Sequence, residues 1–163
     1  MLTFVVSKTT MKLAGTYMFS APRDKVFAAL TDPAIIQRCI DGCEKLVEAA
    51  PDQYDAHLKI GVAGLKGSYV GKVQLKDKNP PESYTLVLEG KGGPGFVKGT
   101  AKITLTPVGT GQAPEAGQTE LRCEADVHVG GVIAAVGSRL IEATAKKMLD
   151  EFVRKFGQQL SGS

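Results

Sequence analysis

The sequence predicts an α+β protein in which a curved antiparallel β-sheet wraps around one long C-terminal helix. Residues 130–160 form a continuous helical pattern, with apolar side chains every three or four positions. Residues 44–129 alternate between apolar and polar side chains, as half-buried antiparallel strands do. Two short helices fit between a first strand and this alternating region, so the expected order is strand, two short helices, six strands and long helix.

The N-terminal elements follow from local signals. A strand is expected over residues 11–20, where one face is apolar and the other polar. A helix follows over residues 21–31, with Ser20 as its expected N-cap. A second short helix is expected over residues 34–40, ending before Gly42.

Turn residues divide the alternating region into six strands. Pro-Asp, Asn-Pro-Pro and Gly-Gly-Pro-Gly runs separate most of them. The strands are expected over residues 43–50, 53–62, 65–76, 83–91, 96–107 and 119–129.

The two halves of the C-terminal helix differ in side-chain size. Its first residues, 130–138, are rich in Gly and Ala, whereas residues 148–156 carry bulky Met, Leu and Phe side chains. A helix that closes a uniform core has no reason to thin out at one end, because protein interiors are closely packed. We therefore expect the second half to seal a core and the first half to line a binding cavity.

Length and composition predict a single domain over residues 11–160, with an N-terminal extension over 1–10 and a short tail over 161–163. The chain has 163 residues, a net charge of +3 and no Trp, which argues against a nucleic-acid partner. Its three Cys residues lack the spacing of a disulfide framework, and with two His residues and no CxxC pair no metal site is expected. Neither a signal peptide nor a membrane-spanning stretch of about 18 apolar residues is apparent.

Four Gly-punctuated segments follow one another along the chain. They are IIQRCIDGCEKL after Thr31-Asp32-Pro33, GLKGSYVGKVQL at 64–75, GKGGPGFVKGTAKITL at 90–105 and VHVGGVIAAVGSRLIEATAKKML at 127–149. In order and spacing they resemble the carbon monoxide dehydrogenase CoxG family of the START/Bet v 1-like (SRPBCC) superfamily, whose fold is the helix grip. The family usually has Pro where Asp41 stands here.

The resemblance implies an accessory protein with a bound apolar molecule. Such proteins are associated with tethering a molybdenum hydroxylase of the carbon monoxide dehydrogenase type to the membrane, and with carrying a respiratory quinone. The expected ligand is menaquinone or a similar prenyl lipid, with no covalent cofactor. The expected location is the cytoplasm, peripheral to the inner face of the cell membrane.

The pattern around Tyr69 predicts one wall of the cavity. If Tyr69 points inward, so do Gly67 and Gly71, and these glycines either leave ligand space or bend a strongly curled sheet. Phe96 is expected either to act as a lid or to cap the core. The residues expected to contact the ligand are Tyr69, Leu65, Gly67, Gly71, Leu86, Leu88, Phe96, Val97, Ala101, Ile133, Val136, Gly137, Leu140, Thr144, Ile36 and Ile40.

Basic residues form the other candidate site. Lys66, Lys72, Lys98 and Arg139 are expected to face a membrane or protein partner, the alternative being an ordinary solvated surface. No catalytic constellation is found, so a non-enzymatic carrier is predicted. The alternatives are a tether or assembly factor that carries no ligand, and an enzyme of the polyketide-cyclase kind.

Overall fold

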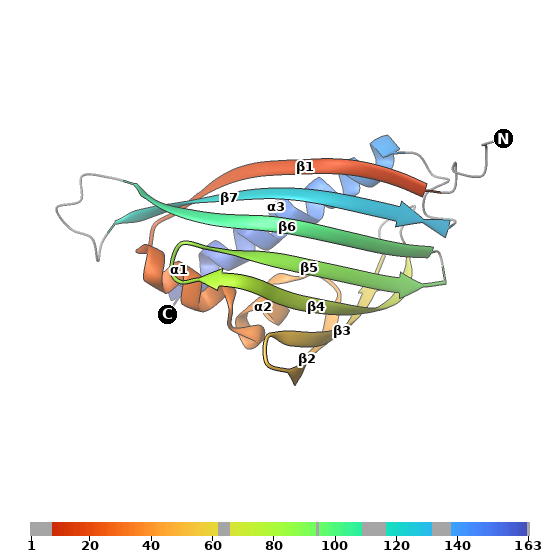
Figure 1. Ribbon diagram of the computed structural model, residues 1–163, viewed down its shortest axis with the longest axis horizontal. Coiled ribbons are helices and arrows are strands. Elements are labelled where there is room, and N and C mark those ends of the chain that lie inside the picture. Colours follow the sequence, from red (N-terminus) through yellow and green to blue (C-terminus); the bar gives the residue numbers. More distant parts are fainter. Residues whose placement is uncertain (1–7, 62–65, 94, 109–116, 132–137, 163) are drawn as a thin grey trace.

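The computed structural model describes residues 8–61, 66–93, 95–108, 117–131 and 138–162. Within them the strands form one curved antiparallel sheet of seven strands in the order β1-β7-β6-β5-β4-β3-β2 (Figure 1). The predicted fold class and element order are therefore confirmed. The strands are β1 (Lys8–Phe19), β2 (Cys43–Ala50), β3 (Gln53–Ile60), β4 (Gly67–Asn79), β5 (Ser83–Gly92), β6 (Gly95–Val108) and β7 (Gln118–Gly130).

The two short helices, α1 (Arg23–Leu30) and α2 (Pro33–Cys39), follow β1 as predicted. Asp32 caps α2, accepting a hydrogen bond of 3.0 Å from the backbone N–H of Ala34. The predicted Ser20 cap of α1 is wrong, because Pro22 occupies the N-cap position and no side chain caps that helix.

The turn into β2 forms at Gly42, as the sequence predicts. Gly42 has a φ of +83°, and a Cβ atom on it would collide with the carbonyl oxygen of Lys59. The carbonyl of Gly42 in turn accepts a hydrogen bond of 2.8 Å from the backbone N–H of Lys59. Only glycine fits this left-handed, crowded position.

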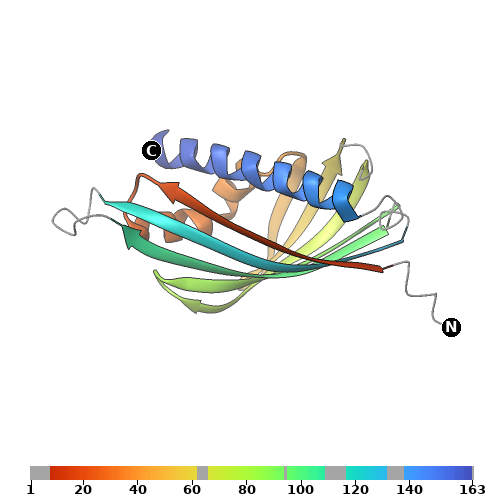
Figure 2. The ribbon, with the colours of Figure 1, turned by 90° about the horizontal axis from the view of Figure 1, so that it is seen from above.

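Strand register divides the sheet into two faces. The concave face is turned toward the helices and the convex face away from them (Figure 2). Facing residues of paired strands share a side of the sheet, so the pairs Leu13–Ala125 and Leu86–Ala101 lie on the concave face. Lys12 and Asp126, one residue along, form an ion pair of 3.1 Å on the convex face.

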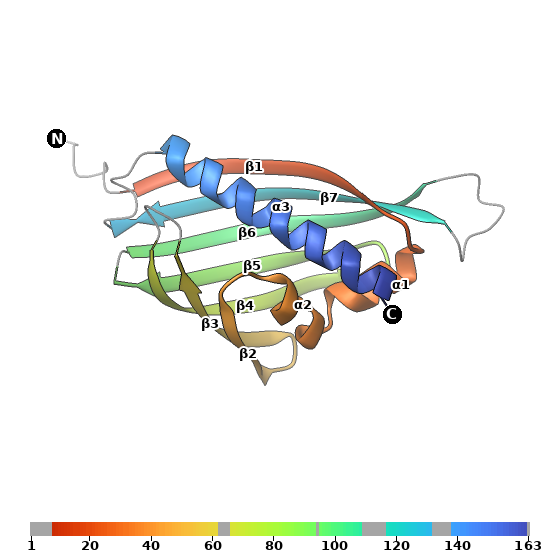
Figure 3. The ribbon, with the colours of Figure 1, turned by 180° about the vertical axis from the view of Figure 1, so that it is seen from behind.

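The long helix α3 (Ser138–Gly162) lies across the concave side, close to β1 at the edge of the sheet (Figures 2 and 3). Its C-terminal end reaches α1 and α2. The predicted helix over residues 130–160 starts too early at Gly130, which closes β7 by pairing with Phe96 and Lys8. Residues 132–137 lie outside the described residues.

Two other boundaries differ from the prediction. β1 begins at Lys8, three residues before the predicted strand, because the pairing with β7 continues to that residue. α3 extends to Gly162. None of the helices in the described ranges is long and apolar enough to cross a membrane.

Candidate functional site

Among the described residues, the concave face carries two separate clusters of buried apolar side chains. The first lies beneath α1 and the C-terminal half of α3, and includes Phe19, Tyr84, Leu105 and Phe156. The second consists of Met11, Tyr69, Val129 and Ile141, with partly buried neighbours such as Leu13 and Val97. The bulky end of α3 therefore seals a core, as its sequence predicts.

The boundary between the clusters contains little side-chain volume. On β4, β5 and β6 its concave positions are Gly71, Leu88, Gly90 and Gly99. Leu88 faces the same side as the buried Tyr84, yet its side chain is 38% exposed. A Cβ atom on Gly90 would meet no heavy atom within 4 Å. We call the space that these four boundary residues border the concave gap, and it is the candidate ligand site.

The glycines of the concave gap have different structural roles. A Cβ atom on Gly71 would lie 2.7 Å from the carbonyl oxygen of Glu89 on the adjacent strand. Gly71 is therefore required by the close approach of two backbones in a strongly curved sheet. This agrees with the expectation that such glycines bend the sheet, and not with the expectation that they leave ligand space. Gly90, which pairs with Gly71, borders open space instead.

Tyr69 points inward, as predicted. Its side chain is buried, and its ring extends across to β5, where a Cβ atom on Gly92 would lie 2.9 Å from the ring. Burial raises the pKa of Tyr69 above that of a free tyrosine. The phenol is protonated at neutral pH, as a free tyrosine already is.

Among the predicted ligand contacts that the structure describes, most lie on the concave side. Buried or partly buried there are Tyr69, Gly67, Gly71, Leu86, Val97, Ala101 and Thr144, and Leu88 is the exposed one among them. Ile36 packs against the first cluster, and Ile40 is partly buried at the end of α2. Leu65, Ile133, Val136 and Gly137 lie outside the described residues.

Phe96 does not lie where a ligand contact was predicted. It pairs with Gly130 on the convex face, one residue from the concave Val97, and its ring covers Gly130 so closely that a Cβ atom there would collide with it. Phe96 is therefore neither a lid over the concave gap nor a cap of the core. Leu140 is 43% exposed on the flank of α3 turned away from β1.

The four predicted basic residues do not form one surface. Lys72 and Lys98 are exposed on the convex face, but Glu89 stands between them in the register. Arg139 belongs to α3, on the other side of the sheet. Lys66 is exposed at the residue before β4. The convex face therefore mixes charges of both signs, as an ordinary solvated surface does.

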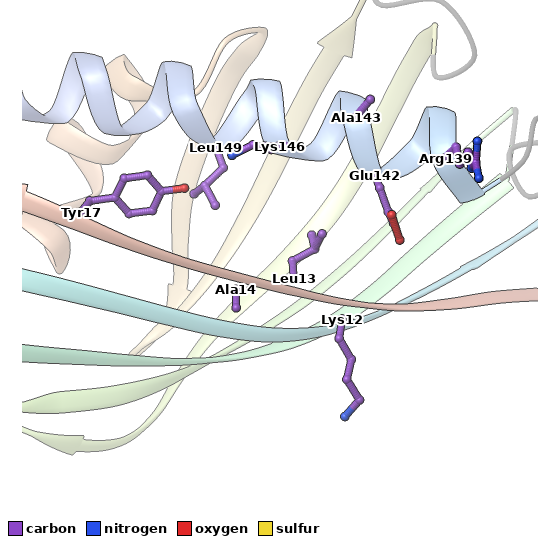
Figure 4. A pocket seen from close by; sticks show the side chains of 9 residues that line it. All are labelled: Lys12, Leu13, Ala14, Tyr17, Arg139, Glu142, Ala143, Lys146 and Leu149. Carbon is purple, nitrogen blue, oxygen red and sulfur yellow. The ribbon is translucent and has the colours of Figure 1, made fainter.

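A cleft of about 340 Å³ separates β1 from the first half of α3 (Figure 4). The sequence gives no signal for it, since the approach of α3 to β1 joins opposite ends of the chain. We call it the edge cleft. It is lined by Lys12, Leu13, Ala14, Tyr17, Arg139, Glu142, Ala143, Lys146 and Leu149.

Tyr17 connects the two walls of the edge cleft. Asp150 on α3 lies close enough for its negative charge to act on the Tyr17 hydroxyl. Burial, together with the negative charge of Asp150, raises the pKa of Tyr17. The described residues contain no group of three or more His, Cys, Asp or Glu side chains that could hold a metal ion.

Comparison with known proteins identifies one matching family and several similar structures. The family model of the CoxG subunit of carbon monoxide dehydrogenase matches residues 15–161. A conserved protein from Geobacillus kaustophilus is 33% identical, with a TM-score of 0.88, covering 94% of this chain and 97% of that one. No curated protein matches significantly.

Two more distant structures share the fold. A START superfamily protein from Mycobacterium smegmatis is 15% identical, with a TM-score of 0.71, covering 93% of this chain and 97% of that one. The Zhui aromatase/cyclase from Streptomyces sp. R1128 is 14% identical, with a TM-score of 0.67 and 94% of each chain covered. At this identity the likeness concerns the fold alone.

Proposed function

The chain belongs to the carbon monoxide dehydrogenase CoxG family, and we propose that it is an accessory protein that carries a respiratory quinone. In this proposal the quinone moves between the inner face of the cell membrane and a molybdenum hydroxylase of the carbon monoxide dehydrogenase type. The description of the family supports the association with that dehydrogenase. The cargo is menaquinone or a similar prenyl lipid, held without a covalent bond.

The concave gap is the observation that carries this proposal. Leu88 remains 38% exposed inside the curve of the sheet, and Gly90 borders open space. The surrounding concave side chains are apolar, among them Leu86, Val97 and Ala101. Apolar walls with a few polar groups are typical of sites for small apolar molecules.

Apolar walls also suit a carrier that must release its cargo. Burying a prenyl tail gains about 0.8 kcal/mol per CH₂ group relative to water. A tail taken from a bilayer gains far less, because it was already in an apolar environment. The free energy of the tail in the proposed site is therefore close to its free energy in the membrane, so that loading and release are both feasible.

Tyr69 and Thr144 are the proposed contacts for the quinone head group. Both side chains are buried, Thr144 on α3 and Tyr69 on β4. The Tyr69 hydroxyl is protonated at neutral pH, and a protonated hydroxyl donates to a quinone carbonyl oxygen. A Tyr69→Phe variant is expected to bind menaquinone more weakly while retaining its affinity for an apolar probe without carbonyl groups.

A non-enzymatic role is supported by the position of the histidines. The chain has two histidines, His57 and His128, and both are exposed on the convex face, away from the concave gap. The likeness to an aromatase/cyclase extends to the fold only. The proposed carrier therefore performs no acid–base chemistry with a histidine.

Native mass spectrometry with lipid extraction tests the proposal directly. The protein is purified without detergent from a bacterial host that makes menaquinone. A prenyl quinone bound at close to one per chain supports the carrier. Protein that is free of lipid, and that also fails to take up added menaquinone, contradicts the carrier and favours a tether without cargo.

A pair of tryptophan variants locates the binding site. Leu88→Trp places a large ring in the concave gap, whereas Val70→Trp places the same ring on the convex face, where Val70 is 55% exposed. We expect menaquinone binding to be lost in Leu88→Trp and retained in Val70→Trp. Equal binding by both variants would place the ligand elsewhere.

A further inference from the structure

The edge cleft reaches the concave face at the boundary between the two apolar clusters. Leu13 and Tyr17 both line the cleft. Leu13 packs against the second cluster, however, and Tyr17 against the first. Gly15, between them, carries no side chain. The edge cleft and the concave gap therefore both lie on the boundary between the clusters.

Among the described residues, the hydrogen bonds and ion pairs that join α3 to other elements lie in its C-terminal half. Lys25 of α1 donates a hydrogen bond of 3.0 Å to the carbonyl of Leu160, and Arg38 of α2 donates one of 2.8 Å to Gln159. Lys155 pairs with Asp41. All three contacts hold the C-terminal half of α3. In the first half, Ile141 and Thr144 are buried, whereas Glu142 and the other charged residues of the edge cleft are exposed.

We propose that the edge cleft is the portal through which the apolar ligand enters and leaves the concave gap, between β1 and the first half of α3. This inference rests on the proposed function. During passage, the first half of α3 moves away from β1 while the C-terminal half stays on α1 and α2.

The chemistry of the edge cleft suits the passage of an amphiphile. Its inner side chains, Leu13, Tyr17 and Leu149, are partly buried and mainly apolar. The residues of α3 at its mouth, Arg139, Glu142 and Lys146, are exposed and charged. An apolar tail crosses the inner part while a polar head stays hydrated at the mouth.

The interaction between Tyr17 of β1 and Asp150 of α3 spans the portal. Opening the portal moves these two groups apart. A Tyr17→Phe variant keeps the ring and removes the hydroxyl, so its portal opens more often. Ligand uptake and ligand release are then both faster, and the equilibrium affinity stays the same.

Stopped-flow kinetics with N-phenyl-1-naphthylamine, an uncharged apolar fluorophore, test the portal on the full chain. Glu142 extends into the space between α3 and β1 (Figure 4), so Glu142→Trp obstructs the mouth. Glu142→Gln removes the same charge without adding bulk and serves as the matched control. We expect the association and dissociation rates of Glu142→Trp each to fall about tenfold, with an unchanged dissociation constant.

Four outcomes of these experiments show whether the edge cleft is the portal. Slower exchange in Glu142→Trp, normal exchange in Glu142→Gln and faster exchange in Tyr17→Phe support the portal. Unchanged rates in both Glu142→Trp and Tyr17→Phe overturn it and place the entrance elsewhere. A weaker equilibrium affinity of Glu142→Trp overturns it in favour of a binding role for the cleft. Failure of the unmodified protein to bind any apolar molecule overturns the proposed function itself, and the portal with it.

Discussion

The ring of Tyr17 lies over Gly15, two residues earlier on the same strand. A Cβ atom on Gly15 would stand 2.7 Å from the hydroxyl oxygen of Tyr17 and 2.8 Å from its Cε2 atom. The missing side chain thus lets the ring lie along β1, with its hydroxyl near enough to Asp150 on α3 for the carboxylate charge to act on it. Gly15 therefore positions the residue that connects the sheet edge with the long helix.

Gly15→Ala is expected to destabilise the protein by about 1–2 kcal/mol, because the ring of Tyr17 must leave its position. In a Tyr17→Val background the same substitution is expected to be neutral or slightly stabilising, because alanine restricts the unfolded chain more than glycine does. Urea unfolding of the four proteins measures the coupling. Equal effects in both backgrounds would show that the two residues are independent.

Gly71 and Gly90 form a second informative pair, since they face each other across β4 and β5. Gly71→Ala brings a Cβ atom to within 2.7 Å of the carbonyl oxygen of Glu89, whereas Gly90→Ala meets no atom within 4 Å. We expect Gly71→Ala to cost about 2 kcal/mol in the free energy of unfolding. Gly90→Ala is expected to be neutral or to stabilise by up to about 1 kcal/mol.

Chemical denaturation measures both glycine variants, and ligand binding adds a second readout. A methyl group on Gly90 occupies part of the concave gap, so its affinity for N-phenyl-1-naphthylamine is expected to fall while the fold stays intact. A Gly93→Ala variant is the control, because Gly93 also borders open space but belongs to the turn after β5. Loss of stability in Gly90→Ala would show that the gap is filled.

The order and direction of the elements could be predicted from the sequence, because they depend on local signals. The alternation along residues 119–129 fixes which side of β7 is apolar, and Tyr69 faces inward as its neighbours predict. Ser20 is not the N-cap of α1, since proline and serine both favour a helix start and only the fold selects between them.

Relationships between distant segments could not be predicted. The edge cleft exists because α3 lies beside β1, and no local pattern in either element indicates the other. The same limit applies to the glycines. The sequence shows that Gly71 and Gly90 lack side chains, but the carbonyl of Glu89 near one and the open space near the other depend on the curvature of the sheet.

Variants of Phe96 and Val97 distinguish the convex side of the sheet from the concave side as the place of the ligand. Successive residues of a strand face opposite sides, so only one of them could face the ligand. Phe96→Ala is expected to leave the affinity for menaquinone unchanged, although the loss of the ring over Gly130 lowers stability. Val97→Ala is expected to alter the affinity. Titration of both variants with menaquinone provides the comparison, and the reverse pattern would restore Phe96 as a ligand contact.

Phe156 is expected to be the residue that fixes α3 most strongly. Its side chain is completely buried, with its ring edge-on to Phe19 at 5.2 Å and stacked on Phe152 at 5.8 Å. Phe156→Ala would cost about 3–5 kcal/mol, a large part of the stability of an ordinary domain. Phe156→Leu retains much of the volume and is expected to cost about 1–2 kcal/mol while the protein stays folded.

Thermal and urea unfolding of Phe156→Leu measure this cost, with Leu140→Ala as the control on the same helix. Leu140 is 43% exposed, so its truncation is expected to change the free energy of unfolding by less than about 0.5 kcal/mol. A larger effect at Leu140 than at Phe156 would mean that α3 is fixed through its first half. That result would also contradict the portal, which requires the first half of α3 to be the part that moves.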